Sequence, residues 1–82
     1  MNNPNQIANL RFVPVDASAF ESVSYVPSSR TLYVKFRNGL PSLTFANVPG
    51  FRYDGLLAAP RKDAYFKTFI ENQFLTTPIK LP

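Results

Sequence analysis

The sequence contains neither cysteine nor histidine. The lack of cysteine excludes disulfides, thiolate metal ligands and cysteine nucleophiles. The lack of histidine removes the Ser-His-Asp arrangement, most zinc sites and the usual general base near neutral pH. The carboxylates do not replace them, because no two are spaced as an acid–base pair or a metal site; they are Asp16, Glu21, Asp54, Asp63 and Glu71. We therefore expect no enzymatic activity, no bound metal and no cofactor.

Long apolar runs are missing too. No stretch approaches the ~20 apolar residues of a membrane span. The start of the chain, MNNPNQIAN, has neither the basic region nor the apolar run of a secretory signal. We expect a cytoplasmic protein with no membrane partner.

What is present is a basic chain of 82 residues, of which 45% are hydrophobic. That size accommodates one small domain with a single core. Nine Lys and Arg against five Asp and Glu give a net charge of +4, which attracts polyanions such as nucleic acids. We expect the folded domain at 10–75, a flexible start at 1–9 and an extended tail at 76–82.

Alternating apolar residues predict a three-stranded antiparallel meander. Segments 20–26, 31–36 and 42–46 each place apolar side chains on one face. Asn38-Gly39, between the last two segments, is a strong hairpin signal because both residues tolerate the positive φ of a type I′ turn. Residues 10–15 could add a short edge strand, since Pro14 argues against a central one.

Two helices are predicted after the strands. Pro49 suits the first turn of a helix that Pro60 ends, and Asp63 suits the start of a second helix. The second helix carries an apolar stripe with helical spacing, which places these residues in the core: Phe66, Phe69, Ile70 and Phe74. The predicted fold is α+β, with both helices packed on the apolar face of the sheet.

This order of features resembles the KTSC family, which is named for the C-terminal domain of some lysyl-tRNA synthetases. The family pattern begins with a small residue, a Tyr that ends the first strand and a Leu-x-Val-x-Phe strand. A turn Gly, a Val-Pro, a Leu-rich helix, a Phe and a later Ile follow. The matching positions span roughly residues 13–74: Ser18, Tyr25, Leu32, Val34, Phe36, Gly39, Val48, Pro49, Leu56, Ala59, Phe66 and Ile70.

The resemblance implies the meander and two-helix fold and, through the synthetase association, RNA binding. Many members of the family are free-standing small bacterial or phage proteins, and this sequence is similar to those. It departs from the family pattern at the central Tyr-x-Tyr, which becomes Leu43-Thr44-Phe45 without either hydroxyl. After the first helix, Arg61 and Asp63 replace the usual Ser and Gly.

The solvent face of the second predicted strand suggests a nucleic-acid site. Tyr33, Lys35 and Arg37 alternate with the core residues, so a ring that can stack on a base lies beside cations that can meet phosphates. Arg30 at the strand entry and Lys67 on the second helix complete the predicted basic surface. The same strand residues also fit an ordinary exposed strand whose charges prevent aggregation.

A protein-binding patch is the alternative. Arg52, Tyr53 and Tyr65 fall on or near the helices, and Tyr and Arg are favoured interface anchors. Arg61 and Lys62 in the interhelical loop belong to the same candidate set, and they also fit a solvated connection or a phosphate held at a helix N-terminus. The tail, TTPIKLP, could add to a partner as an extended segment. We expect a small binding module, with RNA as the first candidate partner and a protein as the second.

Overall fold

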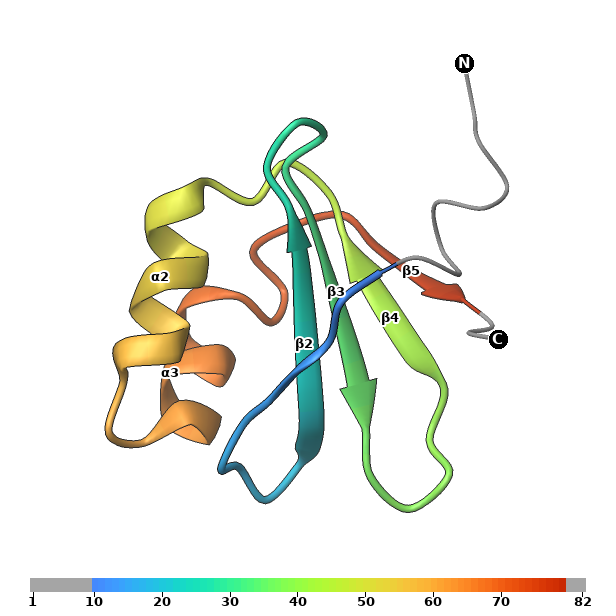
Figure 1. Cartoon of the computed structure of the whole chain (residues 1–82), viewed down its shortest axis with the longest axis vertical. Helices are drawn as coiled ribbons and strands as arrows, with labels where there is room; N and C mark the ends of the chain where they lie inside the picture. The colour runs from blue at the N-terminus through green and yellow to red at the C-terminus, as the bar shows by residue number, and fades with distance from the viewer. Residues whose placement is uncertain (1–9, 80–82) are drawn as a thin grey trace.

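The computed structural model describes residues 10–79, which form a five-stranded antiparallel sheet and two helices (Figure 1). The strands are β1 (Val13–Pro14), β2 (Phe20–Val26), β3 (Thr31–Phe36), β4 (Ser42–Phe45) and β5 (Thr76–Ile79), and they lie side by side in that order. The helices, α2 (Gly50–Ala58) and α3 (Lys62–Phe69), follow β4. The α+β class and the β2–β3–β4 meander are confirmed. The predicted flexible start and the last three residues of the predicted tail lie outside the described residues.

The sheet has five strands rather than the three predicted, because both ends of the described chain pair with it. β1 takes the position of the expected edge strand. Residues 76–79 of the predicted extended tail are extended, but they pair with β4 as an edge strand of the domain and place Leu43 opposite Pro78. These residues are therefore not free to add to a partner through that edge. Both edge strands are short, and each contains a proline, Pro14 or Pro78.

A β-bulge interrupts the pairing of β2 with β3. In β3 the paired residues Lys35 and Phe36 are adjacent. Their partners in β2, Ser22 and Phe20, are separated by Glu21, the extra residue of the bulge. The bulge leaves the Glu21 side chain exposed at the start of β2 while Phe20 remains fully buried.

Residues with positive φ form the hairpin turns. Asn38 has a φ of 63° and Gly39 a φ of 72°, as predicted for the β3–β4 turn. Arg30, at the end of the β2–β3 turn, has a φ of 54°. Its carbonyl accepts a 2.8 Å hydrogen bond from the amide of Val48, so the backbone of this turn is fixed to the segment that enters α2.

The core lies between the sheet and the helices, with Phe66 of α3 at its centre. The centroid of its ring lies 5.2 Å from that of Phe20, 6.0 Å from that of Phe36 and 5.5 Å from that of Phe45. The largest fully buried side chains come from the sheet, from α2 and from the segments flanking the helices: Phe20, Val23, Leu32, Val34, Phe45, Val48, Leu56 and Ile70. Each such side chain contributes about 1.5–3 kcal/mol of transfer free energy.

Both ends of α3 differ from the prediction. The helix begins at Lys62, so Asp63 lies within its first turn instead of capping it. It ends at Phe69, whose side chain is 38% exposed and does not belong to the core. Phe74, beyond the helix, is half-buried against the core. The predicted core placement is thus confirmed for Phe66, Ile70 and Phe74 and wrong for Phe69.

Candidate nucleic-acid interface

The sheet face turned away from the helices, which we call the outer face, presents two aromatic residues. Ser24 of β2 pairs with Tyr33 of β3. The pairing of Val13 with Val23 places the preceding residue, Phe12, beside Ser24. Phe12 and Tyr33 therefore lie on either side of a small serine. Sequence reasoning missed Phe12, because its face is defined only by the register of the two-residue strand β1.

Lys35 lies next to these rings on the outer face. Its ammonium is 5.7 Å from the centroid of the Phe12 ring, which is within the range of a cation–π interaction. Ser24 is only 3% exposed, and Tyr33 and Lys35 are half-buried. The rings and the lysine are thus held against the sheet instead of extending freely into water.

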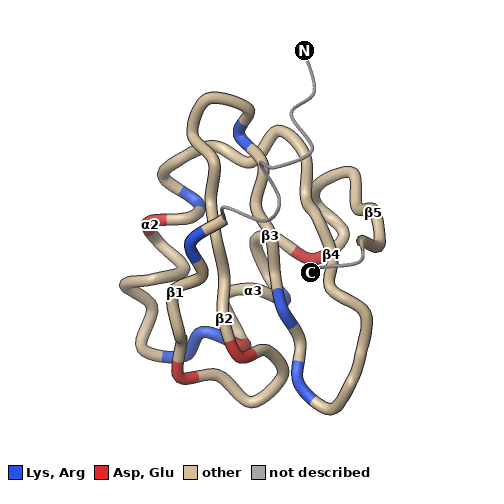
Figure 2. The backbone as a smooth tube through the Cα atoms, turned by 45° about the vertical axis from the view of Figure 1, so that its right-hand side comes forward, with Lys and Arg blue, Asp and Glu red and all other residues tan. Residues whose placement is uncertain are grey.

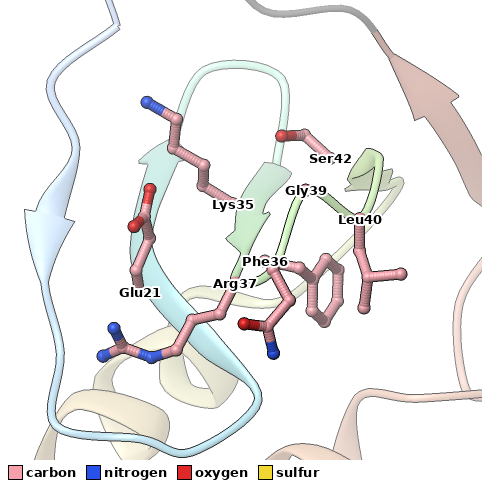
Figure 3. Close-up of a pocket in the computed structure, with 8 residues that line it drawn as sticks. Glu21, Lys35, Phe36, Arg37, Gly39, Leu40 and Ser42 are labelled. Carbon is pink, nitrogen blue, oxygen red and sulfur yellow. The ribbon is translucent and has the colours of Figure 1, made fainter.

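A groove of about 480 Å³ lies beside the β3–β4 turn, next to Lys35. We call it the bulge groove, because the bulge residue Glu21 lines it. Figure 3 shows the carboxylate of Glu21 between the ammonium of Lys35 and the guanidinium of Arg37. The full lining is Glu21, Lys35, Phe36, Arg37, Asn38, Gly39, Leu40 and Ser42.

Arg37 is also part of the fold. Its Nε donates a 3.1 Å hydrogen bond to the carbonyl of Ala17, and its amide donates one of 3.2 Å to the carbonyl of Ala19. Asp63 holds the same loop from the helix side, accepting hydrogen bonds from the amides of Ser18 at 2.7 Å and Ala19 at 3.0 Å. These amides, with a smaller effect from Arg37, lower the pKa of the Asp63 carboxyl. The loop at 17–19 is therefore fixed between an arginine of the sheet and an aspartate of α3.

The predicted basic surface is only partly assembled. Tyr33 and Lys35 share the outer face, and Arg37 borders it at the bulge groove. Arg30 is exposed in the turn at the other end of β3. Lys67 is exposed on α3, in the helix layer on the opposite side of the sheet. Figure 2 shows Lys and Arg distributed around the fold instead of gathered in one patch.

The alternative site is assembled in part as well. The guanidinium carbon of Arg52 lies 5.0 Å from the ring centroid of Phe51 and 4.5 Å from that of Phe69. The ring of Tyr65 lies 4.8 Å from that of Phe69, and its hydroxyl is so close to Gly55 that a Cβ there would overlap it. We call Phe51, Arg52, Tyr65 and Phe69 the helix patch.

The other members of the alternative set lie elsewhere. Tyr53 stacks on Tyr25 of the sheet, with a centroid distance of 4.9 Å and an interplanar angle of 16°. Burial, and secondarily the charge of Asp54, raises the pKa of the Tyr53 hydroxyl. Arg61 and Lys62 line a separate groove of about 370 Å³ at the interhelical loop. The ammonium of Lys62 donates a 2.8 Å hydrogen bond to Ala59.

Within residues 10–79, no group of three or more His, Cys, Asp or Glu residues could hold a metal ion. In the same part of the chain, no helix is long and apolar enough to cross a membrane. The features that remain are the outer face, the bulge groove and the helix patch. Each of these surfaces presents aromatic or charged side chains that can contact a binding partner.

Comparison with known proteins assigns the family. Residues 16–74 match the KTSC domain, so the chain belongs to the KTSC domain family, as the sequence pattern predicted. The crystal structure of a KTSC domain protein from Yersinia pestis is similar to this fold, with a TM-score of 0.81 and 27% sequence identity. The match covers 87% of this chain and 99% of the other. No curated protein matches the chain.

Proposed function

We propose that this protein is a non-enzymatic module that binds single-stranded nucleic acid, preferentially RNA, through the outer face of its sheet. The proposal is carried by one observation: Phe12, Tyr33 and Lys35 converge on that face around the small residue Ser24. Bases stack on exposed aromatic rings with a gain of about 1–3 kcal/mol per base. A lysine beside the rings can meet the phosphate that links two stacked bases.

The electrostatic share of the binding is small. Lys35 lies beside the rings and Arg37 at the edge of the face, so one or two phosphates are neutralised. For single-stranded nucleic acid, a plot of the logarithm of the binding constant against the logarithm of the salt concentration has a slope of about −0.7 for each phosphate contacted. We therefore expect a slope between about −0.7 and −1.4, which is shallow enough for stacking to maintain binding near physiological salt.

The test is fluorescence anisotropy of a labelled single-stranded RNA, with duplex DNA for comparison, across a salt series. Phe12→Ala, Tyr33→Ala and Lys35→Glu should each weaken RNA binding at a temperature where circular dichroism shows that the variant is still folded. Arg37 is left intact, because its bond to Ala17 would confuse a loss of binding with a loss of structure.

The matched control is Lys67→Glu, which makes the same charge change on α3, away from the outer face. Binding that Lys35→Glu abolishes and Lys67→Glu spares would support the proposal. Equal losses of RNA affinity in Lys35→Glu and Lys67→Glu would show that binding arises only from attraction by the net charge. Binding of both the RNA and the duplex DNA that disappears near physiological salt would show the same.

The helix patch favours a second candidate function, docking on a protein. Arg52 lies between two rings, and Phe51 is 65% exposed. Aromatic residues and arginine are enriched at interfaces, and the positive charge suits a partner with an acidic, partly apolar surface. Phe51→Ala should abolish recovery of one nuclease-resistant partner in a pull-down. Tyr53 is unsuitable for this test because it stacks on Tyr25 within the fold. Recovery of nuclease-sensitive material alone would count against this second function.

A further inference from the structure

We propose that the bulge groove binds a guanine base, which gives the RNA-binding face a base preference. This inference rests on the proposed function and deepens it. The feature to be explained is the position of Glu21, whose carboxylate lies between the cations of Lys35 and Arg37 (Figure 3). A negative charge there weakens a site for phosphate.

The charge of the groove suits a base better than a phosphate. Lys35 and Arg37 contribute +2 and Glu21 contributes −1, so its charged side chains sum to only +1. A phosphate would also lie close to the carboxylate, and like charges repel at short range. A neutral base avoids this repulsion. Its donors can bond the carboxylate, and its acceptors can bond the cations.

Guanine is the base whose edge matches these groups. On its Watson–Crick edge the N1–H and the N2 amino group are neighbouring donors, and a carboxylate has two oxygens to accept from both. The adjacent O6 is an acceptor for a lysine or an arginine. Adenine and cytosine offer one amino donor beside a ring acceptor, and uracil offers one N–H between two carbonyls. Unpaired RNA bases are commonly recognised on this edge.

The groups needed for this contact are available in the groove. Within residues 10–79, the carboxylate of Asp63 accepts hydrogen bonds, whereas the exposed carboxylate of Glu21 accepts none. Arg37 donates its Nε hydrogen to the carbonyl of Ala17, which fixes its guanidinium at the groove, and in the described part of the chain its terminal nitrogens make no hydrogen bond. Leu40, which is 59% exposed, and Phe36 add apolar surface to the groove.

The groove also adjoins the stacking surface. Lys35 lines the groove, and its ammonium lies against the ring of Phe12. One RNA strand can therefore stack on the outer face and place a neighbouring base in the groove. We expect a preference for one guanosine next to nucleotides that stack without regard to sequence.

The experiment compares labelled oligouridine with the same strand carrying one central guanosine, adenosine or cytidine, by fluorescence anisotropy at fixed salt. The wild type should bind the guanosine strand about tenfold more tightly than oligouridine, as expected of a good bidentate base contact. Glu21→Gln should lose this preference and bind oligouridine as well as before or better, because a negative charge has been removed. Asp54→Asn, an exposed carboxylate on α2, is the control and should keep the preference.

The outcomes separate the two proposals. Equal wild-type affinity for all four strands would overturn the guanine site and leave the RNA-binding function standing. A guanosine preference that survives in Glu21→Gln would also overturn it, because the preference would then arise elsewhere. No binding to any strand would overturn the RNA-binding function and the guanine site together.

Discussion

Replacing Asp63 with alanine should destabilise the fold, because this one side chain holds a loop that lies more than forty residues away in the sequence. Its carboxylate accepts hydrogen bonds from the amides of Ser18 and Ala19 at 2.7 and 3.0 Å. Hydrogen bonds to a charged group contribute about 1.5–3 kcal/mol each when protected from water. These two are exposed, so water replaces part of each, and we expect a total loss of about 1–2 kcal/mol.

For a domain of this size, 1 kcal/mol corresponds to a shift of about 4–8 °C in the unfolding midpoint. Thermal unfolding followed by circular dichroism should therefore show a midpoint lower by roughly 4–16 °C at pH 7 in Asp63→Ala. Asp16→Ala, an exposed carboxylate close to the same loop, is the control and should change the midpoint little.

The same contacts predict a pH dependence with a defined sign. The two amides lower the pKa of Asp63 in the folded protein. A group with a lowered folded pKa stabilises the fold above its unfolded pKa, about 3.9, and loses that effect as the pH falls through the folded value. The difference between the midpoints of wild type and variant should therefore begin to shrink as the pH falls below about 4, and it should vanish below the folded pKa. A variant within 1 °C of the wild type at pH 7, or an equal difference at pH 7 and pH 3, would refute this account.

Further predictions concern the packing around α2. Tyr25→Phe removes a 2.5 Å hydrogen bond from the hydroxyl to a backbone carbonyl and should lower the urea midpoint by an amount equivalent to about 1 kcal/mol, with an unchanged slope. Gly55→Ala should destabilise the wild type, because the Tyr65 hydroxyl occupies the space of the new methyl group. In a Tyr65→Ala background the same change should stabilise the helix by up to about 1 kcal/mol, and equal effects in both backgrounds would contradict the overlap. Leu56→Ala, at a side chain with no exposure, should cost about 2–5 kcal/mol in denaturant unfolding. Phe51→Ala, at an exposed site, should cost less than about 0.5 kcal/mol, and a similar loss in both variants would be inconsistent with the described core.

The parts of the fold predicted correctly from the sequence are those with local signals. The alternation of Leu32, Val34 and Phe36 sets the face of β3, and Asn38-Gly39 has the positive φ that the turn requires. These signals act within a few residues, so they do not depend on the rest of the chain.

The missed features depend on contacts between distant segments. The strand 76–79 is made largely of Thr and Pro and pairs because β4 offers a free edge. Phe12 gains a place on the outer face only through the register of β1. The bonds of Asp63 and Arg37 to the loop at 17–19 span 44 or 45 and 20 residues, respectively. The Phe69 ring lies outside the core, against Tyr65 of the same helix and Arg52 of α2, and the periodicity of α3 alone does not indicate this contact between two helices.

The prolines of the two edge strands have a consequence for molecules held close together. Pro14 lies in β1 and Pro78 in β5, and a proline offers no amide hydrogen to a further strand. The proline therefore interrupts the row of backbone hydrogen bonds that either edge could form with a second copy of the sheet. Each edge strand is also too short to form such a row on one side of its proline. Copies joined in tandem, or concentrated on one long ligand, should therefore not join their sheets edge to edge.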